Sequence, residues 1–198
     1  MRPIVTACLP VLLLLGACDE TDLVSVRVRL REDLSGSVRS SALQESGAGG
    51  AVEAASLGVV WDSRAEVVCA AGRFAELSDL SLADARFEAG AGAGGLHFVR
   101  VVLPRGEGAR WPAAFVPLAK DRREAVAQAL DPERKASEVG EALKIEIELP
   151  GSVVSHGLTG KVRGAKSSAE GELATLIVPV DAGRTEGEPF VWHLTWQQ

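Results

Sequence analysis

Apolar and polar side chains alternate in several short segments of the chain. At residues 24–31, four apolar side chains alternate with one serine and three arginines, which is the period-2 pattern of a strand with one buried and one cationic face. Residues 144–149 alternate in the same way, with Ile and Leu on one face and Lys and Glu on the other. Three further apolar segments predict strands, at Leu96–Leu103, Leu173–Val180 and Pro189–Trp196.

The segments that follow the first strand carry shorter signals. Asp33–Gly36 has the composition of a turn, so Ser37–Leu43 is expected to return beside the first strand as a hairpin. Small residues and glycines predict a loop at Glu45–Ala55. Short strands are then expected at Leu57–Trp61 and Arg64–Ala70.

One segment, between Trp111 and Leu130, has clear helical periodicity. Its regular part is expected to begin near Pro117, because proline suits a first helical turn. Strands outnumber helices and do not alternate with them regularly, so the pattern predicts an α+β fold, a mostly antiparallel β-sheet with one main packed helix. The apolar stripe that would pack on the sheet consists of Leu118, Ala125, Val126, Ala129 and Leu130.

Charges on two of the predicted strands complement each other. Arg27, Arg29 and Arg31 form an outward row on the first strand, and Glu146 and Glu148 form an outward row on the strand at 144–149. We therefore expect both strands in one sheet, where side-by-side placement would pair the charges. The alternative, which we favour less, is that the arginines contact anionic lipid headgroups.

The N-terminus has the layout of a lipoprotein signal peptide. A basic start is followed by the apolar run Ile4–Leu15 and then by Leu15–Gly16–Ala17–Cys18, a bacterial lipobox. The run is too short for a comfortable bilayer span, which needs roughly 20 residues. We expect residues 1–17 to be the signal peptide and Cys18 to be the lipid attachment site. The alternative is a buried apolar helix with an incidental cysteine.

Lipidation of Cys18 would determine where the protein resides. Its diacylglyceryl group, with acyl chains such as palmitate, would hold the protein on the extracytoplasmic side of the cell membrane. Residues 18–22 would form a lipidated tether and residues 23–198 a single α+β domain. Asp19, directly after the lipidated cysteine, would retain the protein on the inner membrane where the enterobacterial sorting rule applies.

Composition agrees with one folded domain. The 198 residues are 46% hydrophobic and 24% charged, with a net charge of −6, which excludes a typical nucleic-acid-binding protein because phosphates require clustered cations. Of the three cysteines, Cys8 would be removed with the signal peptide and Cys18 acylated. Cys69 is then expected to be a small buried side chain in a mature chain without an internal disulfide.

The sequence patterns typical of catalytic sites are weak in this chain. Gly90–Gly95 matches G-x-G-x-x-G, but a predicted strand follows it where the dinucleotide motif needs a helix, so a hairpin loop is expected. His97, His156 and His193 lack the spacing of a zinc site, and Ser155–His156 is interpreted as a polar pair in a loop. We expect no catalytic, cofactor-binding or metal-binding residues, no cofactor and no enzymatic activity. The tryptophans are expected in the core: Trp61, Trp111, Trp192 and Trp196.

Several short motifs occur in a familiar order. The lipobox precedes a V-x-V-x-L strand at Val26–Leu30, a D-x-S-G turn at Asp33–Gly36, the segment E-L-P-G-x-V at Glu148–Val153 and a terminal strand bearing tryptophans. From about residue 20 to its end the chain thus resembles the LppM-type lipoprotein domain. The resemblance implies an extracytoplasmic, membrane-tethered α+β module, of a type implicated in glycolipid binding in mycobacteria. Many such proteins also have a C-terminal membrane span, for which this sequence has no second apolar run.

The expected function is therefore that of a lipid-anchored module that binds an envelope lipid, glycolipid or protein partner, and not nucleic acid. Two alternatives stay open. One is a structural or assembly lipoprotein with no small ligand, and the other, less favoured, is an envelope enzyme whose site is created by the fold.

Overall fold

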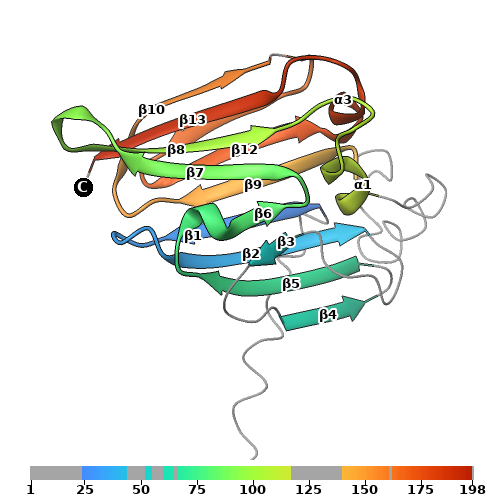
Figure 1. The fold of residues 1–198 in the computed structure, drawn as a ribbon, viewed down its shortest axis with the longest axis horizontal. Coiled ribbons are helices and arrows are strands. Elements are labelled where there is room, and N and C mark those ends of the chain that lie inside the picture. Colours follow the sequence, from blue (N-terminus) through green and yellow to red (C-terminus); the bar gives the residue numbers. More distant parts are fainter. Residues whose placement is uncertain are drawn as a thin grey trace, which may run out of the picture.

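Two β-sheets make up most of the part of the chain that the computed structural model describes. Sheet A has seven strands with β1 (Ser25–Leu30) at its centre, and sheet B has six. The strands of the two sheets overlie one another in Figure 1, and one cluster of buried side chains is drawn from both sheets. The described residues are 24–43, 52–54, 60–64, 67–116, 140–160 and 162–197.

Each sheet is described by its order of strands from edge to edge. Sheet A runs β11 (Lys166–Glu170), β12 (Leu173–Pro179), β9 (Ala142–Glu148), β1, β2 (Gly36–Leu43), β5 (Val67–Phe74) and β4 (Val60–Arg64). Sheet B runs β10 (Ser152–Thr159), β13 (Phe190–Gln197), β8 (Leu96–Leu103), β7 (Ala85–Ala91), β6 (Leu80–Leu82) and β3 (Val52–Ala54).

The pairing of β1 with β9 confirms the expectation drawn from charge complementarity. The two strands lie side by side, with Arg27 opposite Glu146 and Arg29 opposite Glu148. They run parallel, whereas every other pair among the described strands is antiparallel. A parallel pair requires a long crossover, and here more than 110 residues separate Leu30 from Ala142.

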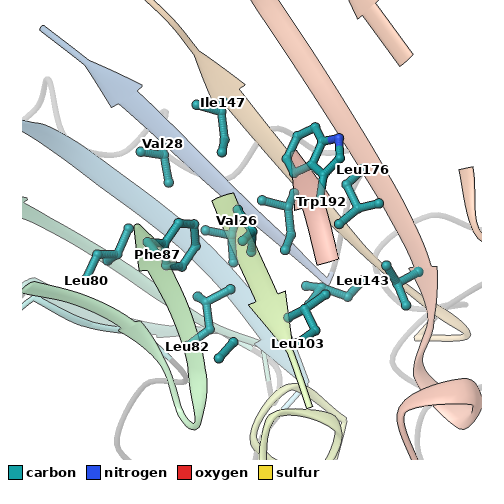
Figure 2. Packing of buried hydrophobic residues seen from close by; sticks show 14 of the residues in the cluster. Val26, Val28, Leu80, Leu82, Phe87, Leu103, Leu143, Ile147, Leu176 and Trp192 are labelled. Carbon is teal, nitrogen blue, oxygen red and sulfur yellow. The ribbon is translucent and has the colours of Figure 1, made fainter. Parts of the chain in front are cut away.

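The alternating segments bury the faces that the sequence predicts. Burial alternates along β1, β9 and β13, and the inward-facing residues of all three strands join one core. In Figure 2, Val26, Val28 and Ile147 of sheet A lie with Phe87 and Leu103 of sheet B among these packed side chains. Three tryptophans are fully buried, as expected: Trp111, Trp192 and Trp196. The Trp61 side chain lies outside what the structure describes.

The helices in the described part of the chain are two short ones, α1 (Trp111–Phe115) and α3 (Val180–Arg184). Asp84 fixes the start of α1, because its carboxylate accepts hydrogen bonds from the backbone N–H groups of Arg110 (2.7 Å) and Trp111 (2.9 Å). The fold is thus mostly antiparallel β-structure with little helix where it is described. The predicted packed helix from Pro117 to Leu130 lies outside the described residues.

Several predicted boundaries need correction. Strand β3 lies within the segment expected to be a loop, and β4 and β5 begin three residues later than predicted. Strands β10 and β11 were not predicted at all. They lie at the edges of their sheets, and exposed residues predominate along both, so neither has the regular apolar alternation that marks the buried strands. Ser155–His156, interpreted as a loop pair, lies within β10.

Candidate functional site

The predicted anchor, Cys18, lies outside the described residues, as do the signal peptide and the tether. The description begins at Val24, and β1 begins one residue later. Seven peptide steps separate Cys18 from Ser25, which at about 3.6 Å each span at most ~25 Å. A lipid on Cys18 would therefore hold the central strand of sheet A close to the membrane.

Cys69 lies on β5 and is less buried than expected. It forms a disulfide bond, and its half-buried side chain packs against the core. The expectation of an unpaired sulfur concerns the mature chain, in which Cys8 is removed and Cys18 is acylated, and stays a prediction for that form. The full-length chain contains all three sulfurs. Cys8 and Cys18 both lie outside the described residues.

The outward side of sheet A carries most of the cationic residues that the sequence singled out. The Arg29 guanidinium lies 3.0 Å from the Glu148 carboxylate, with the two side chains 70% and 28% exposed. Glu146 accepts a 2.9 Å contact from Lys144 on its own strand. Arg31 follows the end of β1 and belongs to the hairpin turn, where its N–H bonds the carbonyl of Ser35. The predicted neutralisation of the row is therefore confirmed at Arg29.

Two further arginines, which sequence reasoning missed, extend the cationic surface beyond β1. Arg39 on β2 lies directly opposite Arg27, and Arg73 on β5 lies opposite Ser37. Both side chains are exposed. The sequence does contain a signal for Arg39, because it lies within the predicted return strand Ser37–Leu43. Which side chains of that strand point outward was not predicted, so Arg39 was not placed beside Arg27.

The three histidines do not share a site. His97 stacks on the indole of Trp196, with the ring centroids 5.3 Å apart. His156 makes a 2.9 Å hydrogen bond with the Ser167 hydroxyl, and His193 lies on β13 opposite Arg100. Ser155, the neighbour of His156, instead bonds Thr195 at 2.7 Å, so adjacent residues of β10 have different partners and form no Ser–His pair.

The glycine-rich segment behaves as the predicted hairpin connection. Its first residues end β7, a short 3-10 turn (η3, Ala93–Gly95) follows, and β8 begins immediately afterwards. Gly94 and Gly95 have φ of 70° and 76°, in the left-handed region that glycine adopts without strain. The segment opens no α-helix, so it lacks the helix N-terminus on which a dinucleotide pyrophosphate would rest.

The turn between β1 and β2 has a perturbed carboxyl group. The Ser35 hydroxyl donates to Asp33 Oδ1 at 2.6 Å, and the Ser35 backbone N–H donates to the same oxygen at 3.0 Å. These hydrogen bonds, the hydroxyl's first, stabilise the ionised form and lower the pKa of Asp33. Asp33 is exposed in a turn, so its role is to fix the hairpin geometry.

Within the part of the chain that the structure describes, no group of three or more His, Cys, Asp or Glu side chains could hold a metal ion. A search of the same residues finds no helix with the length and hydropathy of a membrane span. Comparisons of the chain with protein-family models, curated proteins and solved structures find no match.

Proposed function

We propose that this protein is a lipid-anchored, extracytoplasmic bacterial lipoprotein whose β-rich domain binds a lipid, glycolipid or protein of the cell envelope. The observation that carries the proposal is the lipobox Leu15–Gly16–Ala17–Cys18 at the end of a short apolar run. The resemblance to the LppM-type domain supports the binding role. The proposal assigns no catalytic, cofactor-binding or metal-binding residue.

The anchor and the domain fit together physically. Two acyl chains on Cys18 would bury many methylene groups, each worth about 0.8 kcal/mol, and so hold the protein stably in the bilayer. The short connection to β1 would then keep sheet A near the headgroups. A partner in the same membrane would meet the domain at high local concentration.

The state of the Cys18 sulfur tests the anchor. A thioether to diacylglycerol and a disulfide cannot occupy the same sulfur, and Cys69 is disulfide-bonded in the full-length chain. The proposal expects the membrane-extracted protein to begin at Cys18, and its N-terminal peptide to carry the mass of the diacylglyceryl group. An N-terminal peptide joined to the Cys69 peptide through a reducible bond would overturn the assignment.

A matched pair of variants separates the anchor from other effects of losing a thiol. Cys18→Ser should leave the precursor unprocessed or release the protein from membranes, whereas Cys8→Ser, in the segment that is removed, should leave processing and membrane retention unchanged. Retention of a processed Cys18→Ser protein that lacks the lipid mass would contradict the proposal.

A structural or assembly role with no small ligand is the second candidate. The large side chains that form the core cluster between the sheets favour it, because three tryptophans and four phenylalanines are fully buried there. Native mass spectrometry of the membrane-extracted protein distinguishes the two. A lipid that stays bound stoichiometrically supports the binding role, and a bare polypeptide supports the assembly role.

A further inference from the structure

The outward side of sheet A concentrates positive charge, most of it without an ion-pair partner among the described residues. Arg27 on β1, Arg39 on β2 and Arg73 on β5 are all exposed. Within the described part of the chain, none of these three side chains has a carboxylate partner. Arg29, between them, is paired with Glu148 at 3.0 Å. We call Arg27, Arg29, Arg39 and Arg73 the arginine face.

The register across β1 and β2 opposes like charges. Arg27 and Arg39 are direct cross-strand partners, an arrangement that destabilises an antiparallel pair. On its other side Arg27 lies opposite Glu146 of β9, whose carboxylate is in contact with Lys144, and Arg29 is paired with Glu148. An external anion bound between Arg27 and Arg39 would relieve this repulsion.

The excess of positive charge is local to the arginine face and is opposite in sign to the net charge of the chain. The four arginines lie on the adjacent strands β1, β2 and β5, and Glu148 lies on the neighbouring β9, so the surplus is three positive charges, four minus one. Lys144 and Glu146 on β9 cancel each other, whereas the chain as a whole carries −6. On sheet B, Arg100 on β8 is paired with Glu88 on β7 at 3.5 Å, and the exposed Arg86 on β7 lies opposite uncharged residues. A partner that is acidic and broad would therefore be drawn to sheet A and not to sheet B.

We propose that the arginine face docks on the anionic phospholipid headgroups of the membrane in which the protein is anchored. This inference rests on the proposed function for its choice of partner, because a lipid on Cys18 would bring β1 within ~25 Å of the bilayer surface. A sheet surface spreads its charges in one plane, as headgroups do. Contact would orient the domain with sheet A towards the membrane and sheet B towards the partner.

Vesicle binding of the full-length Cys18→Ser chain tests the face without the acyl anchor. The probes are vesicles of phosphatidylcholine alone and of phosphatidylcholine mixed with phosphatidylglycerol, at low and high salt. Each basic residue near an anionic surface strengthens partitioning about fivefold, so Arg39→Glu, a change of two charges, should weaken binding to the mixed vesicles about 25-fold. High salt should reduce binding of the parent chain by screening.

Arg86→Glu is the matched control. Arg86 is exposed on β7 of sheet B, so the variant changes net charge equally and should weaken vesicle binding less than about twofold if the contact is confined to sheet A. A second signature separates docking from damage to the fold. Arg39→Glu places a carboxylate opposite Arg27, so its unfolding midpoint should rise while its vesicle binding falls. Arg73→Ser serves as the test variant if Arg39→Glu does not fold.

Three results would overturn the proposal. Equal losses in Arg39→Glu and Arg86→Glu would show a general effect of net charge, and equal binding to neutral vesicles would assign the contact to the apolar N-terminal segment. Salt-sensitive binding to soluble polyphosphate without binding to vesicles would identify a free polyanion as the partner. Failure of the anchor would instead appear in the Cys18 peptide mass, which does not depend on the vesicle measurements.

Discussion

Replacing Ser167 by alanine tests how the two sheets are joined at one edge. Ser167 lies on β11 of sheet A, and its hydroxyl accepts a 2.8 Å hydrogen bond from the indole N–H of Trp192 on β13 of sheet B. The same hydroxyl makes the 2.9 Å bond with His156 on β10. One oxygen therefore connects a buried donor, an exposed imidazole and two edge strands that share no hydrogen-bonded ladder among the described pairs.

The burial of Trp192 determines how much stability Ser167→Ala should cost. Its side chain has no exposed surface, so removal of the acceptor leaves a buried N–H unsatisfied, at a cost of about 1–3 kcal/mol. The bond to exposed His156 adds less, because water replaces it. Ser168→Ala, at the exposed neighbouring position of β11, is the matched control and should change the free energy of unfolding by less than about 0.5 kcal/mol.

Trp196 supplies an internal comparison. It is equally buried, but its indole N–H has no hydrogen-bond partner. Tryptophan to phenylalanine changes volume similarly at both positions, so Trp192→Phe should cost about 1 kcal/mol more than Trp196→Phe, the net worth of one hydrogen bond. The cycle of Ser167→Ala with Trp192→Phe should likewise show a coupling free energy of about 1 kcal/mol.

Urea unfolding followed by far-ultraviolet circular dichroism measures these differences without relying on tryptophan fluorescence. For a chain of this length a loss of 1–3 kcal/mol corresponds to a melting temperature lower by about 2–12 °C. If Ser167→Ala unfolds at the same urea concentration as Ser168→Ala, or the coupling free energy is near zero, the hydroxyl does not join the sheets.

Three other local interactions give further predictions. Ser35→Ala should raise the pKa of Asp33 towards its usual value, as measured in a carbon-detected NMR titration. Because folding lowers that pKa, the two hydrogen bonds from Ser35 stabilise the native state at neutral pH. This stabilisation is lost as the pH falls through the pKa that Asp33 has in the folded protein. Asp84→Ala, which removes the acceptor for the N–H groups of Arg110 and Trp111 at the start of α1, should cost about 0.5–2 kcal/mol in urea unfolding. Gly183→Ala should cost about 1–3 kcal/mol because its methyl group would overlap the buried tryptophan of α1, whereas Gly157→Ala, where the methyl group would meet open space, should have little effect on the melting temperature.

Strands that bury one face were predictable because burial leaves a period of two in the sequence. Leu96–Leu103 was predicted with its observed bounds, and Trp192 and Trp196, which were expected in the core, are buried side chains of the terminal strand. The neighbouring placement of β1 and β9 followed from their complementary charges. The parallel direction of that pair could not be inferred, because charge rows match equally well in either direction.

The edge strands and the arginine face lay beyond sequence reasoning for a common reason. Exposed residues predominate on β10 and β11, so burial imposes little pattern on them. Arg27 lies opposite Arg39 only in the register that the hairpin turn sets. A slip of one residue would move Arg39 to the other face of the sheet. At the candidate site, lipidation of Cys18 stays a prediction, because Cys18 and the signal peptide lie outside the residues that the structure describes.

The cross-strand pair of Arg27 and Arg39 is unfavourable for the stability of sheet A, which suits a binding role for this surface better than a structural one. Arg27 has two cross-strand neighbours, Glu146 on β9 and Arg39 on β2. A sequence selected only for stability would place an uncharged or acidic residue on the β2 side as well, because unlike or uncharged pairs favour the ladder. The chain instead places Arg39 there, while its neighbours Arg29 and Lys144 each have an acidic partner. Local rules are broken most often where a protein binds something. Here the break lies on the central strand of sheet A and its neighbour, on the strand that the proposed tether would enter, which is where a membrane contact would act on the domain.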